Sequence, residues 1–323
     1  MSFEHPPTEI YLAPESQLSP QEQFLRESLP AQFNTQTASL RAVGLLEGIF
    51  KENASADDDL VIELQEGITG MDGKAYTLPT LEQITKHFSQ EKYAEKISQG
   101  FTKLLIVPFA YPLATIRARY EQALLKHHKA GKLLDRDGNR LELRTKKPLY
   151  FDKCLDKSDE TGNLIYYPKQ FDTENHGGHT KQELLNDPTQ PFPGFHILLI
   201  KPNLTIPREG QEKTTGGRTD LGTDKRITEV LKTIQTDLQY RFEQGTTLED
   251  SLTLDLTNLY ETNRVVDDVG NQKDSVNFNI GVFRKASREV PFSHFDRADQ
   301  CVHVFGGDPK VSHPIFGVRL AVG

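Results

Sequence analysis

The chain has 323 residues, 36% of them hydrophobic and 26% charged, which is typical of a globular protein with a sizeable core. Its formal net charge of -8 at pH 7 disfavours nucleic acid and anionic membrane surfaces as partners, because both repel a negatively charged chain. No apolar run reaches the length of a membrane span, no secretory signal pattern opens the chain, and Cys154 and Cys301 form no disulfide framework, so we expect a cytoplasmic protein.

The first hundred residues predict a helix-rich N-terminal segment, 1–100. A proline-rich arm opens it, and apolar side chains recur at helical spacing over residues 37–50 and again over 80–88. Between these two helices, residues 60–64 form an apolar run of strand length. The pattern changes near residue 101, where we place the start of a second domain, 101–323.

The second domain mixes strand and helix signals. Residues 103–109 predict a buried strand, and a helix follows that begins with Pro112 and ends near Gly131. Further on, residues 195–200 predict another strand, residues 227–238 an amphipathic helix, and Thr246 with Glu249 a capping box ahead of a second helix. The remaining sequence is β-prone but irregular, so the fold class is expected to be α+β.

One group of residues near the C-terminus has the side chains that metal or hydrolytic chemistry uses. In an extended strand His294 and Asp296 point to the same face, and His303 follows shortly after. No HExxH, GxSxG, Walker A or dinucleotide-binding motif accompanies them. Motif specificity alone therefore favours a polar surface strand over catalysis.

Other polar groups give weaker signals. His176 and His179 offer two imidazoles near Asp172, but Gly177 and Gly178 between them indicate an ordered loop rather than a metal-binding helix. The segment 214–218 (TTGGR) could hold an anion through backbone amides and an arginine, although a turn is the simpler interpretation.

The adjacent acids Asp267 and Asp268 precede Gly270 and could bind a structural calcium ion together with backbone oxygens. Adjacent side chains point apart in an extended chain, so this signal is also weak.

The C-terminal motifs carry a family resemblance. They are Val290-Pro291, the alternating strand 300–304 (QCVHV), Asp308-Pro309 and the closing run 316–322 (FGVRLAV). The closing run resembles the final strand of the C-type-lectin fold of formylglycine-generating-enzyme-like proteins, and in particular of the variable proteins of diversity-generating retroelements. The resemblance covers at least residues 240–323, and the chain departs from the pattern in having no tryptophan.

This resemblance implies a C-type-lectin-like, irregular mixed fold that displays side chains for ligand binding. Adenine-directed diversification cannot produce Lys, Glu, Gln, Met or Trp, so Lys285, Glu289 and Gln300 would belong to the scaffold. Arg319 would be a scaffold residue as well, partly buried and paired with an acid. The expected binding residues face outward and are rich in aromatic and arginine side chains, as interface hot spots are. They are Phe283, Arg284, Ser293, His294, Phe295, Asp296, Arg297, His303 and Phe305.

We therefore expect a non-enzymatic protein that binds a protein or small ligand, with no catalytic residue and no cofactor beyond a possible structural calcium ion. The alternative is a metal-dependent enzyme that uses His294, Asp296 and His303, or His176 and His179. A third possibility is an assembly protein that oligomerises through its N-terminal arm and helices. Histidines converging on a common point within about 2 to 2.5 Å would favour the enzyme, and histidines spread over a shallow exposed face would favour display.

Overall fold

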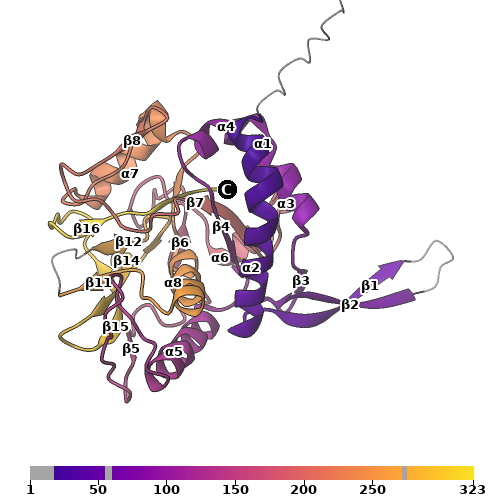
Figure 1. The fold of residues 1–323 in the computed structure, drawn as a ribbon, viewed down its shortest axis with the longest axis horizontal. Coiled ribbons are helices and arrows are strands. Elements are labelled where there is room, and N and C mark those ends of the chain that lie inside the picture. Colours follow the sequence, from indigo (N-terminus) through magenta and orange to yellow (C-terminus); the bar gives the residue numbers. More distant parts are fainter. Residues whose placement is uncertain (1–17, 55–59, 271–274) are drawn as a thin grey trace, which may run out of the picture.

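The protein combines helices with several small sheets, which confirms the expected α+β class (Figure 1). The structure is a computed structural model and describes residues 18–54, 60–270 and 275–323. The proline-rich arm up to residue 17 lies outside the described residues. No described helix is both long enough and apolar enough to cross a membrane.

The N-terminal segment begins with one nearly continuous helical stretch. It consists of α1 (Pro20–Gln23), a π-helical turn η1 (Phe24–Ser28) and α2 (Leu29–Ala42). The helix predicted over residues 37–50 is therefore correct only as far as residue 42. Gly44 then takes the left-handed backbone conformation, with φ at 73°, and the chain turns into strand β1 (Glu47–Ala54).

Strand β1 pairs antiparallel with β2 (Leu60–Thr69), which also pairs with β3 (Ala75–Thr77). The β1–β2 hairpin projects from the body of the molecule (Figure 1). Two short helices follow, α3 (Leu81–Phe88) and α4 (Glu91–Ser98), and the first of them confirms the helix predicted over residues 80–88.

A four-stranded sheet in the order β10-β17-β7-β4 occupies the centre of the fold. Its strands come from distant parts of the chain: β4 (Lys103–Val107), β7 (His196–Ile200), β10 (Gln244–Gly245) and β17 (Leu320–Val322). The closing strand β17 lies between β10 and β7.

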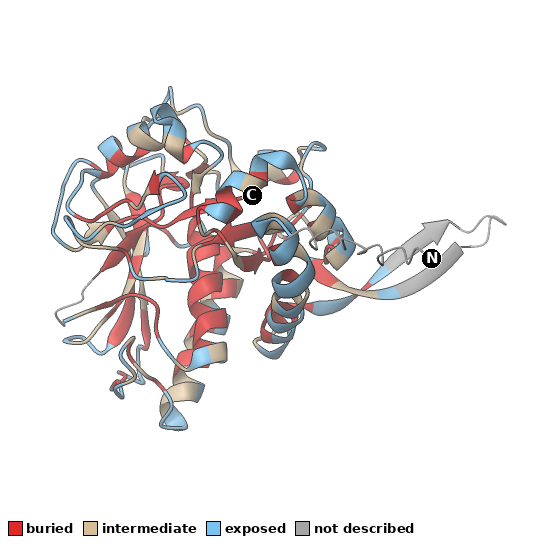
Figure 2. Ribbon diagram, turned by 45° about the horizontal axis from the view of Figure 1, so that its top comes forward, coloured by how far each residue is buried: buried red, intermediate tan, exposed pale blue. Residues whose placement is uncertain are grey.

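The longest helices of the second domain are α5 (Leu113–Lys129) and α8 (Leu248–Thr262), which contact each other. Four leucines of α8, at positions 248, 252, 256 and 259, are fully buried in a core that also contains Leu29 and Leu40 of α2. Figure 2 shows how much of the interior is occupied by buried helix and sheet residues. The N-terminal segment thus shares its core with the C-terminal region.

The cap of α8 differs by one residue from the sequence prediction. Thr247 is the N-cap and pairs with Asp250 in a capping box, whereas Thr246 and Glu249 were expected to do so. Thr246 instead contacts Asn279, and Glu249 turns into the protein interior.

A second sheet holds most of the C-terminal strands in the order β16-β12-β14-β15-β5, and β11 pairs with β14. These strands are β5 (Leu149–Phe151), β11 (Asp268–Val269), β12 (Val276–Phe278), β14 (Val290–Asp296), β15 (Cys301–Gly307) and β16 (Phe316–Gly317).

Smaller elements complete the fold. Two two-stranded ladders pair β6 (Leu164–Tyr166) with β13 (Val282–Arg284) and β8 (Thr214–Thr215) with β9 (Arg218–Thr219). The helices are α6 (Lys181–Leu185), α7 (Ile227–Thr236) and a 3-10 turn η2 (Leu238–Tyr240). Long irregular segments connect these elements.

Candidate functional site

A tight antiparallel hairpin, β14–β15, brings the His/Asp group together. Oδ1 of Asp296 accepts hydrogen bonds from the backbone N–H groups of Ala298 and Asp299, at 2.8 and 2.9 Å, and Gln300 closes the turn with φ at 53°. This turn fixes the register in which His294 lies opposite His303. Alternation along β14 then places Asp296 on the same face as His294, as the sequence predicted.

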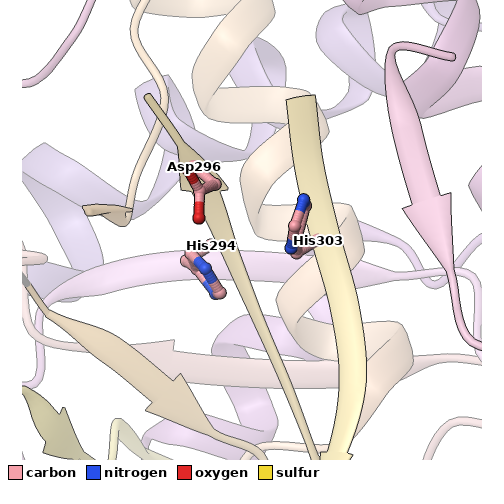
Figure 3. Close-up of side chains that lie close together, drawn as sticks. All are labelled: His294, Asp296 and His303. Carbon is pink, nitrogen blue, oxygen red and sulfur yellow. The ribbon is translucent and has the colours of Figure 1, made fainter. Parts of the chain in front are cut away.

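His294, Asp296 and His303 form a compact cluster on this face (Figure 3). Each offers one ligand atom, and the three atoms lie within 4.8 Å of one another. His294 and Asp296 are half-buried, and His303 is 9% exposed. Among the described residues, this is the one group of three or more His, Cys, Asp or Glu side chains that could hold a metal ion.

Burial favours the neutral form of His303. Its Nε2 lies 3.1 Å from Oδ2 of Asp299, and Asp299 is also paired with Arg144 at 3.0 Å. Burial lowers the pKa of His303 below its ordinary value despite the opposing influence of Asp296 and Asp299. A neutral imidazole held by a carboxylate on one nitrogen keeps the other nitrogen as an acceptor, which is a common arrangement of metal-binding histidines.

Aromatic side chains surround the cluster. The rings of Phe292 and His294 are nearly parallel, at an angle of 16°, with their centroids 5.9 Å apart. The rings of Phe305 and His303 meet edge to face, with their centroids 5.0 Å apart. Tyr150 on the neighbouring strand β5 lies 5.0 Å from Phe305, measured between ring centroids. We call these six residues, Tyr150, Phe292, His294, Asp296, His303 and Phe305, the β14–β15 face.

The sequence interpretation missed two members of this face. Phe292 could have been found, because strand alternation puts it on the same side as His294 and Asp296. Tyr150 gave no such signal, since it comes from a strand about 150 residues away in sequence that pairs with β15 only in the folded protein.

Three of the expected display residues do not face outward, and the prediction for them is wrong. Phe283, Ser293 and Phe295 are each at most 1% exposed. Phe283 contacts the ring of Phe171, and Ser293 lies 3.3 Å from Ser251 of α8, so both belong to the interior. Ser293 and Phe295 alternate with His294 and Asp296 along β14, and a strand that exposes one set must bury the other.

The arginines expected at the binding surface are engaged in ion pairs. Arg284 lies 3.3 Å from Glu289, and Arg297 pairs with Asp135 at 2.8 Å and with Asp268. Arg319 is buried and lies 3.2 Å from Asp267, which confirms the expected burial and pairing with an acid.

The remaining candidates form no site with several ligands. His176 and His179 lie in a loop where Nδ1 of His176 accepts from the backbone of Gly178 at 3.1 Å, and they do not join a metal-ligand group among the described residues. Arg218 in the 214–218 segment is buried and bound to Glu243 at 2.7 Å rather than free to hold an anion.

Asp267 and Asp268, the expected calcium ligands, are both paired with arginine side chains. Asp267 accepts from Arg319, and Asp268 accepts from Arg136 at 3.0 Å and from Arg297. Guanidinium groups on both carboxylates repel a cation, so this pair of acids does not suit calcium.

Comparison of the chain with protein-family models, with curated proteins and with solved structures gives no match. The resemblance to variable proteins therefore stays a prediction from the C-terminal motifs, and function has to be inferred from this chain's own geometry.

Proposed function

We propose that the chain is a binding protein that takes its ligand on the β14–β15 face, with a divalent transition metal held by His294, Asp296 and His303. The observation that carries this proposal is the set of half-buried aromatic rings in contact with His294 and His303, beside a group of two imidazoles and a carboxylate whose ligand atoms lie within 4.8 Å of one another. Imidazole and carboxylate ligands suit zinc, iron and cobalt, and three protein ligands leave coordination positions open for an atom of the ligand.

The aromatic residues support binding as the main activity. Tyr150, Phe292 and Phe305 are each half-buried beside the metal ligands, so they offer rigid apolar area that a partner can cover. Aromatic anchors of this kind dominate interaction hot spots, and they lose little conformational entropy on binding. The location in the C-terminal strands agrees with the display surface that the family resemblance implies.

A metal-dependent enzyme is the second candidate, and the same convergence favours it. A metal with three protein ligands and an open position can lower the pKa of a bound water and so produce a nucleophile. The two candidates differ in whether the metal-loaded protein turns over a substrate or only binds one.

The first experiment titrates the purified chain with Co²⁺ and follows the visible absorption, which reports ligand type and coordination number. We expect one equivalent to bind, and His294→Ala and His303→Ala each to weaken binding by at least about 10-fold, since each removes one of three ligands. His313→Ala is the matched control, because His313 is exposed on the same C-terminal region but lies outside the cluster. Wild-type protein that binds no Co²⁺, or cluster variants that bind it as wild type does, would contradict the metal site.

The second experiment adds acetohydroxamate to the Co²⁺-loaded chain. A shift of the absorption spectrum that saturates shows that coordination positions are open to a ligand, and it should disappear in His294→Ala.

Hydrolysis of 4-nitrophenyl acetate then distinguishes the enzyme from the binding protein. Turnover that depends on both metal and His303 favours the enzyme, whereas ligand binding without turnover favours the binding protein.

A further inference from the structure

A second site lies in a cavity of about 250 Å³ that shares no residue with the β14–β15 face. It is bounded by α3, by α6, by the segment that leads into β7, and by the residues that follow β4 and β6. Its apolar walls include Phe109, Leu184, Leu185, Phe192 and Phe195, and its polar side chains are His87, Tyr167, Gln190, His196 and Gln244. An apolar cavity with a few converging polar groups is the usual form of a small-molecule site.

His196 is held in this cavity by a buried carboxylate. Its Nδ1 lies 2.8 Å from Oδ1 of Asp250, and its ring stacks on Phe109 with the centroids 3.9 Å apart. Asp250 is inaccessible to solvent, and its other oxygen accepts from the backbone N–H of Thr247 at 2.7 Å. Asp250 sits in the first turn of the 15-residue helix α8, where the helix dipole stabilises a negative charge.

The neighbouring buried charges are already compensated. Glu249 accepts from Nζ of Lys181 at 2.9 Å and from the hydroxyl of Tyr166 at 2.6 Å. Lys181 also donates to Asp159 and to the backbone oxygen of Tyr111. Lys181 therefore interacts with Glu249 and Asp159, and the charged or polar side chain that contacts Asp250 is that of His196. In a neutral imidazole whose Nδ1–H donates to a carboxylate, Nε2 carries no proton and is the acceptor.

Tyr167 adds a hydroxyl donor to the same cavity. Its hydroxyl oxygen lies 3.3 Å from Nε2 and 3.4 Å from Nδ1 of His196. The backbone of Tyr167 has φ at 51°, a conformation that bulky residues rarely adopt and that often marks functional positions. Burial, followed by the charges of Asp250 and Glu249, raises the pKa of Tyr167 well above its ordinary value, so the phenol stays protonated and can donate.

The other histidine of the cavity does not compete for this role. Nε2 of His87 is bonded to the hydroxyl of Tyr93 at 2.6 Å. Burial, with a smaller contribution from Lys92, lowers the pKa of His87 to about 4, so this ring stays uncharged at neutral pH. His196 is therefore the proton acceptor in the cavity.

We propose that this cavity binds a small, flat, apolar-ring molecule bearing an ionisable hydroxyl group, with His196 as its proton acceptor, Asp250 as the group that orients His196, and Tyr167 as a hydrogen-bond donor to the ligand oxygen. The apolar walls enclose the ring, and Phe109 and Phe192 offer faces and edges for it. The hydroxyl proton passes to Nε2 of His196, which becomes an imidazolium paired with Asp250. The electron pair of the broken O–H bond stays on the ligand oxygen, where Tyr167 donates to it.

The test uses 4-nitrophenol, whose absorbance changes when it loses its proton, at a pH where the free probe is mostly protonated. With wild-type protein, we expect the phenolate absorbance to rise on titration and to saturate at one equivalent. His196→Gln should lose this rise by at least about 10-fold, because an amide does not accept the proton. Tyr167→Phe, which removes only a hydroxyl, should weaken binding about three- to tenfold.

Two further variants address the cavity itself. Leu184→Trp should fill the cavity and abolish saturable binding, while Leu238→Trp, at a position that is 81% exposed, and His313→Gln should bind as wild type does. Circular dichroism and thermal unfolding establish that each variant is folded. If His196→Gln fails to fold, Tyr167→Phe and Leu184→Trp still test the proposal.

The proposal is overturned if wild-type protein shows no saturable phenolate signal, or if the signal is unchanged in His196→Gln or Leu184→Trp. It is also overturned if ¹⁵N NMR of the free protein finds the proton of neutral His196 on Nε2 rather than Nδ1. Because the two sites share no residue, loss of Co²⁺ binding at the β14–β15 face would leave this result unaffected.

Discussion

Asp255 tests the buried electrostatics, because its carboxyl group is buried in α8 and forms no ion pair with any residue that the structure describes. Its Oδ2 lies 3.5 Å from the hydroxyl of Ser293, and its Oδ1 has no hydrogen-bond partner. Burial first, and then the charge of Asp267, raise the pKa of Asp255 to about 8, although Arg319 opposes this rise. We therefore expect Asp255 to be protonated in the folded protein at neutral pH.

The consequence is a stability that falls as pH rises. An unfolded aspartate has a pKa of about 3.9, so between about pH 4 and pH 8 the folded state binds a proton that the unfolded state does not. The contribution of Asp255 to the free energy of unfolding is then fully present below about pH 4 and is lost as pH rises toward 8. Each pH unit in this window removes about 1.4 kcal/mol, which gives roughly 3 to 4 kcal/mol between pH 5 and pH 8.

Asp255→Asn removes this titration while keeping nearly the same shape. Urea denaturation at pH 5, 6, 7 and 8 measures the free energy of unfolding of both proteins, and wild type should lose about 3 to 4 kcal/mol more than the variant over this range. Asp156→Asn is the control, since Asp156 is exposed and should leave the wild-type slope unchanged. Parallel curves for wild type and Asp255→Asn would refute the reasoning, whatever constant offset separates them.

Three further variants test packing and charge by urea denaturation at one pH. Phe295→Ala should destabilise the protein by about 3 to 5 kcal/mol because Phe295 is 1% exposed, while His294→Ala on the opposite face should cost less than about 1 kcal/mol; equal costs would contradict the assigned faces. Lys181→Met should cost about 3 to 5 kcal/mol, since it strips two buried carboxylates of their cation, and a cost below about 1 kcal/mol would show that they are not charged. Thr247→Ala should cost about 1 kcal/mol through the lost cap of α8, and an unchanged midpoint would contradict the capping geometry.

Local patterns were enough to predict the fold class and several elements. Apolar residues at helical spacing after Pro112 predicted α5, and an apolar run predicted β4. The alternation of side chains along a strand predicted that His294 and Asp296 lie on one face. These signals are local because helix and strand periods are set by backbone geometry within a few residues. The helix prediction failed at residues 43–50, where helix gives way to strand. Gly44 takes the left-handed backbone conformation just after α2 ends, although the apolar spacing typical of a helix continues beyond it.

Tertiary structure alone decided which face of each strand looks outward and which distant residues meet. The sequence determined that 293 and 295 lie opposite 294 and 296, but only packing of β14 against α8 showed that Ser293 and Phe295 are the buried pair. His196 and Asp250 are 54 positions apart, and nothing in their local sequence distinguishes a buried oriented pair from two surface residues. Burial and long-range contact depend on how whole elements pack, so the cavity around His196 became visible only in the folded chain, whereas His294, Asp296 and His303 were already candidates in the sequence.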